Sequence, residues 1–592
     1  MSRRERGGGD VAVLVVLLVL AVPFAITALT TAIAGLLSDG HAIDLGVDGT
    51  LHVLSRLPAH LANPRLAWPA HVRKQLPGTV ALEGELVLST LLVLAAVAAV
   101  LVLVARHLDR RSGGRDRAAR WASRGELADL RTVRPQVGRI TLGARDGKLI
   151  AAEPRVSVLG VGPAQSGKST GLIVPAILEW DGPALSTSIK SDVVHDTHRA
   201  RARRGEVFIF DPTGCTGLTH TPWSPIAAAQ SWEGARRTAA NLLGVADHGA
   251  GSGETETFWK PAGARYLAPL LLAAAHGGHT MAVILRWLAA GEEEEPAELL
   301  RSCPNPNAGP ALEALESVWK ADARFRSSVL QTIATGLDAW QEPAIAAATV
   351  GDGQISAERL LAGPNTLYLI APAHDQRRLR GLFTALVAEI TAAAFERSAQ
   401  TGRPIDPPLL LALDEAANIA PLANLGEIAS TGPGQGVQLL TILQNISQAS
   451  DRWGKDRAET IIANHRARLF CSGIGDRATL EYLSHTLGQE EINRISTHRQ
   501  GPLASGSRTY SSEFRTLAAP HRVRQADTNT ALLVYGRLQP AWINLRPWYA
   551  NRALRELAAA APATADRQRT PGAVRSALTR AATAARGRAR TR

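Results

Sequence analysis

The sequence predicts an α/β fold with an all-helical insertion, preceded by two transmembrane helices. Three observations lead to this prediction. A glycine-rich segment, Gly162–Thr170, separates a short apolar run from a helical stretch; further apolar runs of strand length follow it; and two long uncharged segments precede it. Apolar runs that alternate with helical stretches are typical of a parallel sheet covered by helices.

The two uncharged segments are long enough to cross a bilayer. Residues 11–37 and 86–105 contain no ionisable side chain. As helices they would be roughly 40 Å and 30 Å long, against a hydrocarbon core of about 30 Å. Arginines precede the first segment and follow the second. Because basic residues stay on the cytoplasmic side, residues 38–84 should form an external loop.

The first segment has a second interpretation, as a secretory signal peptide with Ala32-Ile33-Ala34 at its cleavage site. Its apolar stretch is longer than such peptides usually carry. Under both interpretations the loop lies outside and the second segment leads inward. We therefore expect residues 1–110 to anchor the protein in the cell membrane, as a multi-pass protein, with everything after them in the cytoplasm.

The composition is basic and poor in cysteine. The formal net charge is +12 with a pI near 10.1, which favours polyanionic partners such as nucleic acid or anionic lipid. The three cysteines show no metal-binding spacing and are typical of reduced cytoplasmic thiols. Residues 551–592 form an Ala/Arg-rich tail, predicted to be a disordered arm that binds DNA or lipid, or only aids solubility.

The segment Gly162–Thr170 fits the pattern G-x-x-x-x-G-K-[ST] of a phosphate-binding loop, or P-loop. Val156–Gly160 before it is typical of a buried strand, and Gly171–Val174 after it opens a helix. In such a loop the backbone N–H groups surround nucleotide phosphates. The expected cofactor-binding residues are Gly162, Pro163, Ala164, Gln165, Ser166, Gly167, Lys168, Ser169 and Thr170.

Four later apolar runs have the length of buried parallel strands. They are Glu206–Asp211, Thr366–Ala371, Leu409–Leu413 and Val437–Leu443. With the P-loop strand they predict an ATPase domain made of residues 111–225 and 351–550. Between its two parts, residues 226–350 carry Ala/Leu-rich helical stretches such as Ala262–Ala275 and Ala311–Ala339, which predict an all-α insertion domain.

The expected chemistry is hydrolysis of ATP with Mg²⁺ as the metal cofactor. Lys168 should contact the β- and γ-phosphates, and the Ser169 hydroxyl should be a metal ligand. A second metal ligand should follow an apolar strand, and Asp414 does so directly after Leu409–Leu413. Glu415 beside it is the expected catalytic base that orients the attacking water.

Asp211 has the same form, an acid after an apolar run, but Pro212 and Gly214 follow it and favour a structural turn. Gln444 ends the next apolar run, so it should lie near the γ-phosphate as a third catalytic residue; the alternative is an amide that caps a helix.

His465 has no cysteine or second histidine near it in the sequence, so a metal site is not expected there. Arg466 and Arg468 could act as arginine fingers across a subunit interface, although the surface interpretation is slightly favoured.

The chain resembles the type IV coupling proteins of conjugation and type IV secretion, the TraG/TraD-like group. The resemblance rests on several motifs in the same order. They are two N-terminal spans, Gly162–Thr170, Ser186–Asp192, Phe210–Gly214, Trp223–Pro225, Phe258-Trp259, Leu413–Glu415, Gln444 with Gln448, Pro540–Trp542 and Pro547–Tyr549. These motifs cover almost the whole chain except the tail and the external loop.

The resemblance implies a RecA-like P-loop ATPase that assembles as a ring, expected to be a homo-hexamer, at the inner face of the membrane. Such proteins pass a relaxase-bound single DNA strand, or protein substrates, to a type IV secretion channel. Family members often carry an arginine between the acidic motif and the glutamine, whereas this chain has Ser430–Gly436. No arginine finger can therefore be assigned to that segment.

Three alternatives remain beside this interpretation. One is an FtsK-like translocase of double-stranded DNA, against which the helical insertion argues. Another is a secretion receptor for protein substrates only, which would need the same motor. The third is an inactive scaffold, which the intact Lys168, Ser169, Asp414 and Glu415 disfavour.

Overall fold

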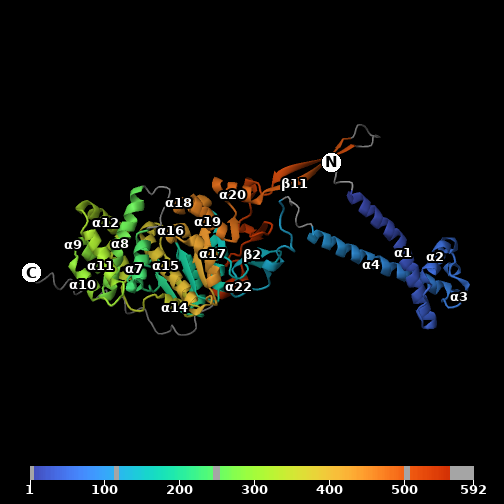
Figure 1. Ribbon diagram of the computed structural model, residues 1–592, viewed down its shortest axis with the longest axis horizontal. Helices are drawn as coiled ribbons and strands as arrows, with labels where there is room; N and C mark the ends of the chain where they lie inside the picture. Colours follow the sequence, from blue (N-terminus) through green and yellow to red (C-terminus); the bar gives the residue numbers. More distant parts are fainter. Residues whose placement is uncertain (1–5, 112–118, 245–253, 499–506, 560–592) are drawn as a thin grey trace, which may run out of the picture. The chain divides into compact units, whose positions relative to one another are not determined.

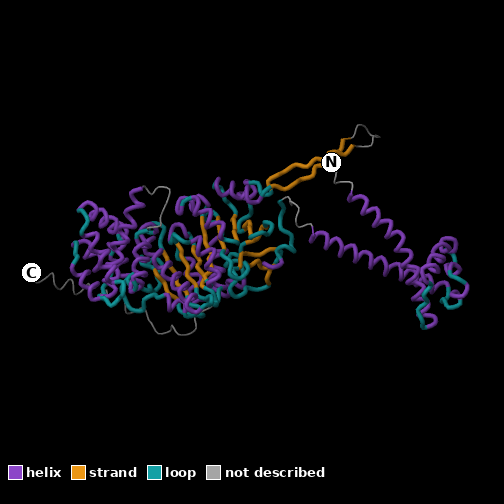
Figure 2. The backbone as a smooth tube through the Cα atoms, viewed as in Figure 1, coloured by secondary structure: helices purple, strands orange, loops and turns teal. Residues whose placement is uncertain are grey.

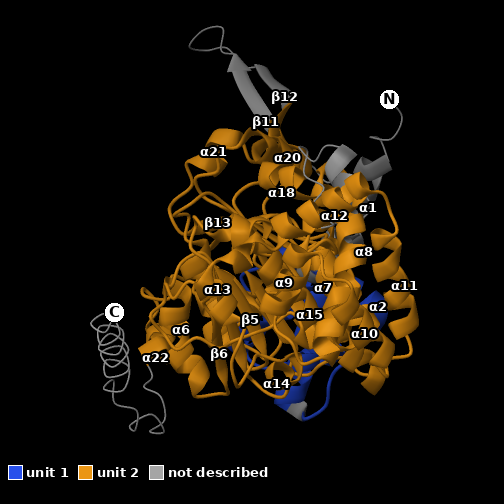
Figure 3. Ribbon diagram, turned by 90° about the vertical axis from the view of Figure 1, so that its left-hand side faces the viewer, with its two compact units in different colours: residues 1–117 blue, residues 118–592 orange. Residues whose placement is uncertain are grey.

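The computed structural model describes residues 6–111, 119–244, 254–498 and 507–559. The chain divides into two compact units, residues 1–117 and 118–592 (Figure 3). Each unit has its own hydrophobic core.

Unit 1 is built on two long helices that pack against each other, α1 (Arg6–Asp39) and α4 (Thr79–Arg111). Each contains a window that is long and apolar enough to cross a membrane, Ala21–Ser38 and Thr79–Val100. Only 28% and 17% of these windows are buried, which is unlike the core helices of a soluble protein. These windows overlap the two uncharged segments, 11–37 and 86–105, that the sequence predicts as membrane spans.

The segment between the two helices, predicted as an external loop, is folded. It contains α2 (Gly46–Arg56), α3 (Ala70–Arg73) and two short 3₁₀ helices. Trp68 is fully buried there and donates its indole N–H to Thr31 Oγ1 of α1 at 2.9 Å. A buried indole needs such an acceptor. The loop therefore carries a small core of its own.

Unit 2 contains a sheet of twelve described strands in the order β1-β3-β2-β14-β13-β10-β4-β9-β8-β5-β7-β6 (Figures 1 and 2). The seven strands from β10 to β6 are parallel to one another. They are β10 (Ala467–Cys471), β4 (Val158–Val161), β9 (Val437–Leu443), β8 (Leu409–Leu413), β5 (Ala184–Ser188), β7 (Thr366–Ile370) and β6 (Val207–Phe210). The predicted α/β fold is confirmed, and all five predicted strands are present.

The other strands of the large sheet run antiparallel and were not predicted. They are β13 (Thr530–Tyr535), β14 (Ala541–Asn544), β2 (Thr141–Arg145), β3 (Lys148–Ala151) and β1 (Arg131–Thr132). β5 was also missed, since Ser186, Thr187 and Ser188 interrupt its apolar character although all three are buried. Apolar runs alone do not identify a strand that buries polar side chains, two of which, Thr187 and Ser188, are hydrogen-bonded.

The described residues of 226–350 form helices joined by loops and contain no strand. The helices are α7 (Trp232–Leu242), α8 (Glu254–His276), α9 (Met281–Ala290), α10 (Glu294–Ser302), α11 (Ala308–Trp319), α12 (Ala323–Gly336) and α13 (Pro343–Ala348). Most of them gather at the end of unit 2 away from β2 (Figure 1). The stretch predicted over Ala311–Ala339 is broken at Asp322, whose carboxylate caps α12 by accepting the N–H groups of Arg324 and Phe325 at 3.0 Å.

A two-stranded hairpin, β11 (Gln489–His498) and β12 (Ser507–Thr516), leaves the body of unit 2 (Figure 2). The sequence analysis did not predict it. Near the C-terminus, α22 (Arg552–Ala559) is described. Residues 560–592, which make up most of the predicted basic arm, lie outside the described residues.

Candidate functional site

The P-loop connects the buried strand β4 to a helix at the carboxyl edge of the parallel sheet. Gln165 and Gly167 take left-handed backbone angles, with φ of 63° and 86°. A Cβ on Gly162 would meet Cys471 Cβ at 2.7 Å and Ser166 Oγ at 2.8 Å. The motif glycines are therefore needed for the turn and for close packing. The helix opens with a wide π turn, Ser169–Ile173, and continues as α5 (Val174–Glu179).

Lys168 folds back over its own loop. Its Nζ donates to the carbonyl oxygens of Gly162 and Pro163, each at 2.6 Å, and the residue is buried. Burial lowers the pKa of Lys168, because a buried ammonium loses hydration. Both acceptors are neutral carbonyls, so an anionic phosphate placed at the loop would compete strongly for this ammonium.

Ser169 and Asp414 come together as predicted. Ser169 Oγ donates to Asp414 Oδ2 at 2.6 Å, and the Asp414 backbone oxygen accepts from Thr187 Oγ1 of β5 at 2.9 Å. Burial and, to a smaller extent, the neighbouring Glu415 raise the pKa of Asp414 to about 6, although the Ser169 hydrogen bond acts to lower it. A hydroxyl and a carboxylate are oxygen ligands of the kind that Mg²⁺ prefers. The pair is chemically suited to hold this metal.

Glu415 directly follows Asp414 in the left-handed region, with φ of 53°. This conformation costs a side-chain-bearing residue about 1 kcal/mol or more. The carboxylate accepts Gln444 Nε2–H at both oxygens, at 2.9 and 3.1 Å, and Asn418 Nδ2–H at 3.1 Å. The Gln444 side chain therefore lies on the expected base, whereas the helix that follows, α18 (Ile446–Trp453), is capped by Asn445.

The strand order explains why these residues meet. β4, β9 and β8 are adjacent and parallel, so the P-loop, Gln444 and Asp414 all follow carboxyl ends at one edge of the sheet. Ligands of open α/β sheets bind at this edge. Residues more than 240 positions apart in sequence are thus within hydrogen-bond distance.

Asp211, Arg466 and Arg468 are not part of this cluster. Asp211, at the end of β6, accepts hydrogen bonds within its own turn, including Thr216 N–H and Oγ1–H at 2.7 Å. Arg466 pairs with Glu153 at 2.8 Å, and Arg468 donates to Tyr482 Oη at 2.7 Å. Both arginines lie toward the amino end of β10, opposite the P-loop edge.

His465 is fully buried beside them, and burial lowers the pKa of His465 to about 4, so it is a neutral core residue.

Sequence reasoning missed Asn418 and the segment after β14. Asn418 lies in α16 (Ala416–Ile419), the helix that follows the acidic motif, and no spacing rule singles it out. The segment after β14 covers the P-loop helix: Trp548 N–H donates to Thr170 O at 3.0 Å, and Arg546 forms a buried ion pair with Glu179 at 2.8 Å. In the sequence, Pro547–Tyr549 stands out only as one of the motifs that resemble those of the coupling protein family.

The fold and the site define a protein of the P-loop NTPase class. The family described as Type IV secretory system Conjugative DNA transfer matches residues 117–577. The chain belongs to this family of coupling proteins, as the order of its motifs predicts.

Relatives of known name agree with this assignment. The chain is 23% identical over 482 residues to Protein VirD4 of Rhizobium rhizogenes, covering 78% of this chain and 70% of that protein. It is 25% identical over 391 residues to the Conjugal transfer protein TraG of Escherichia coli, covering 61% and 60%. The chain thus spans 60% to 70% of the length of these two relatives.

A solved structure shares the fold. The bacterial conjugative coupling protein TrwBdeltaN70, in its unbound monoclinic form, has a TM-score of 0.55 at 20% identity. The similarity covers 74% of this chain and 96% of that chain.

Proposed function

We propose that this chain is a membrane-anchored ATPase that couples ATP hydrolysis to the delivery of DNA, as a relaxase-bound single strand, to a type IV secretion channel. One observation supports it most directly. In a member of the conjugative DNA transfer family, Lys168, Ser169, Asp414, Glu415 and Gln444 converge at one edge of one sheet. These are the groups that phosphoryl transfer needs.

Each residue has a distinct part in the proposed reaction. Lys168 leaves its two carbonyl acceptors and contacts the phosphates, while the loop N–H groups bind them. Ser169 and Asp414 would hold Mg²⁺, and the bound metal would neutralise the charge that develops on the phosphate. Glu415 orients the attacking water and accepts its proton. Gln444 joins Glu415 to the end of β9, so a change at the γ-phosphate can be passed to that strand.

The membrane and assembly parts of the proposal rest on other features. The two apolar helices of unit 1 support an anchor in the cell membrane, with the ATPase unit in the cytoplasm. We further propose a homo-hexameric ring, in keeping with the family resemblance. The relaxase and the channel components are the proposed partners.

The test is the ATPase activity of the full chain in lipid nanodiscs with no nucleic acid, with single-stranded DNA and with duplex DNA. Stimulation by single-stranded DNA is the expected result. Stimulation by duplex DNA alone would favour a double-stranded DNA translocase, and stimulation by neither would favour a receptor for protein substrates only. Absence of hydrolysis under all conditions would contradict the ATPase itself.

A further inference from the structure

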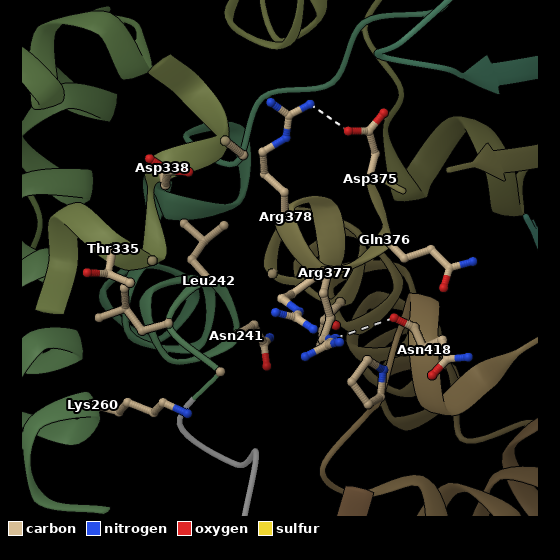
Figure 4. Close-up of a pocket in the computed structure, with 18 of the residues that line it drawn as sticks. Asn241, Leu242, Lys260, Thr335, Asp338, Asp375, Gln376, Arg377, Arg378 and Asn418 are labelled. Carbon is tan, nitrogen blue, oxygen red and sulfur yellow. Dashed lines mark hydrogen bonds and ion pairs between the residues drawn. The ribbon is translucent and has the colours of Figure 1, made fainter. Parts of the chain in front are cut away.

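A large basic cavity lies beside the catalytic edge of the sheet and has no part in the hydrolysis described above. Its volume is about 1060 Å³. Its walls come from the ends of α7 and α12 and from the start of α15 (Gln376–Thr401). α16, which follows Glu415, completes them. Lys260 and Asn418 lie on opposite sides of it in Figure 4.

The lining is cationic. Five basic side chains line the cavity against two acidic ones. The basic residues are Lys260, Arg377, Arg378, Arg380 and Arg452, and the acidic residues are Asp338 and Asp375. Arg378 is paired with Asp375 at 2.7 Å and with Glu342, and Lys260, Arg380 and Arg452 have interaction partners as well. The N-terminus of α15, a helix of 26 residues, opens at the same wall and adds its positive dipole end.

A second, smaller cavity of about 390 Å³ shares two residues with the first, Asn418 and Arg452. Gln448 lines it and accepts the backbone N–H of Gln444 at 3.0 Å. Hydrogen bonds therefore run from Gln448 through Gln444 and Glu415 to Asn418. Both ends of this series line the joined cavities, and its middle is the catalytic carboxylate.

Two of the cavity arginines hold the helix that carries Asn418. Arg380 Nε donates to the backbone oxygen of Asn418 at 3.3 Å, and Arg452 Nε donates to that of Ala417 at 2.9 Å. A phosphate is a stronger acceptor for a guanidinium than a neutral carbonyl is. An anion bound at these arginines would therefore weaken their hold on α16.

We propose that the joined cavities bind the sugar–phosphate backbone of a single DNA strand, and that Asn418 is a positioning residue that releases Glu415 when the strand is bound. In the structure the Glu415 carboxylate is occupied at both oxygens by amide donors. Asn418 and Gln444 both donate to Oε2, so withdrawal of Asn418 removes one of the two donors at this oxygen and makes it a better acceptor for a proton of the attacking water. This inference rests on the proposed function and adds a site and a control element to it.

The cavity's shape and lining favour this ligand. The volume is enough to admit a sugar–phosphate chain. No Phe, Tyr or Trp is among the described lining residues, so bases have no aromatic side chain to stack on. Binding should accordingly be independent of base sequence and strongly dependent on salt.

The first test is direct binding of a fluorescent single-stranded oligonucleotide to the full chain in nanodiscs, titrated at several salt concentrations without nucleotide. It compares wild type with Arg377→Gln, which changes an exposed cavity residue, and Arg537→Gln, which changes an exposed arginine after β13. Arg377→Gln should weaken binding by about tenfold and lower the slope of log K against log salt by about one. Arg537→Gln should do neither.

Equal binding by wild type and Arg377→Gln overturns the site. If Arg377→Gln weakens the binding of duplex DNA as much as it weakens the binding of the single strand, the assignment to a single strand is wrong. Neither result depends on ATP hydrolysis, so failure of the site is distinguished from failure of the proposed ATPase.

The second test addresses Asn418 through the ratio of ATPase rates with and without single-stranded DNA. Asn418→Ala should raise the basal rate and bring this ratio close to one, with ATP binding unchanged. Asn418→Gln, which keeps an amide donor, should restore part of the dependence on DNA. If both rates fall together and the ratio is unchanged, Asn418 is only structural and the proposal is wrong.

Discussion

The ends of β8 and β6 look alike in sequence and differ in chemistry. Asp414 and Asp211 each follow a run of buried apolar residues at the carboxyl end of a parallel strand. Asp414 has one side-chain donor, Ser169, and burial raises the pKa of Asp414 to about 6. Burial also acts to raise the pKa of Asp211, but hydrogen bonds from Thr216, Cys215 and Thr213 outweigh it and hold this pKa below its usual value.

The difference follows from the positions of the two acids in the sheet. β8 lies next to β9 and one strand away from the P-loop strand, whereas β6 is the last strand of the sheet. At β6 the turn itself supplies all the donors, so the carboxylate has no need of a cation. At β8 the buried carboxylate has only one side-chain donor, so it is suited to bind a cation. The number of local donors separates the two acids more reliably than the strand pattern does.

The largest effect should follow from removing the P-loop ammonium. Lys168→Ala should reduce ATP hydrolysis by about 100-fold or more, because the charge on the phosphates is no longer neutralised. Phosphate release by the full chain measures this, with membrane insertion checked by fractionation. Lys148→Ala, at an exposed position of β3, is the matched control and should keep full activity. Sustained turnover by Lys168→Ala would remove the P-loop from the mechanism.

The next effect concerns the base beside Asp414. Glu415→Gln should bind ATP as wild type does but hydrolyse it about 100- to 10,000-fold more slowly, because the amide cannot accept a proton from water. Nucleotide binding by fluorescence and single-turnover hydrolysis separate these two steps. Loss of ATP binding in this variant would instead give Glu415 a structural role.

A smaller effect is expected on the free energy of unfolding, which should change differently when Asp211 and Asp414 are replaced. Asp211→Asn should destabilise unit 2 by about 1–3 kcal/mol, because a carboxylate with several donors is replaced by a weaker acceptor. Asp414→Asn should leave the stability of the metal-free protein unchanged or raise it, since it removes a poorly compensated buried charge. Thermal unfolding of both variants measures the difference. A larger loss for Asp414→Asn would reverse the comparison.

The smallest effect is a pH dependence. The folded pKa of Asp414, about 6, lies above that of an unfolded aspartate, so the folded state holds this proton more tightly. The metal-free protein should therefore lose stability as pH rises through about 6, whereas affinity for Mg²⁺ should increase over the same range and then level off. Asp414→Asn should remove both changes. Equal Mg²⁺ affinity at pH 5 and pH 8 in wild type would contradict the raised pKa.

Much of the catalytic edge could be predicted from sequence because its residues follow local rules. The P-loop is a contiguous pattern, and Asp414 and Gln444 follow long apolar runs that identify β8 and β9. β5 could not be predicted in this way, because its buried Thr187 is bonded to a residue 227 positions away. Asn418 acquires its role only from the distance to Glu415, which no local pattern encodes. The antiparallel strands were missed for a similar reason, since they extend the sheet beyond β10 through tertiary pairing alone.

The most direct test of the difference between the two strand ends is a Mg²⁺ titration of ATP hydrolysis in wild type, Asp414→Asn and Asp211→Asn, each in full-length form. If the carboxylate at the end of β8 holds the metal, Asp414→Asn should need about tenfold or more Mg²⁺ for half-maximal activity, and Asp211→Asn should titrate as wild type does. An unchanged titration for Asp414→Asn, or an equal shift for Asp211→Asn, would contradict this assignment.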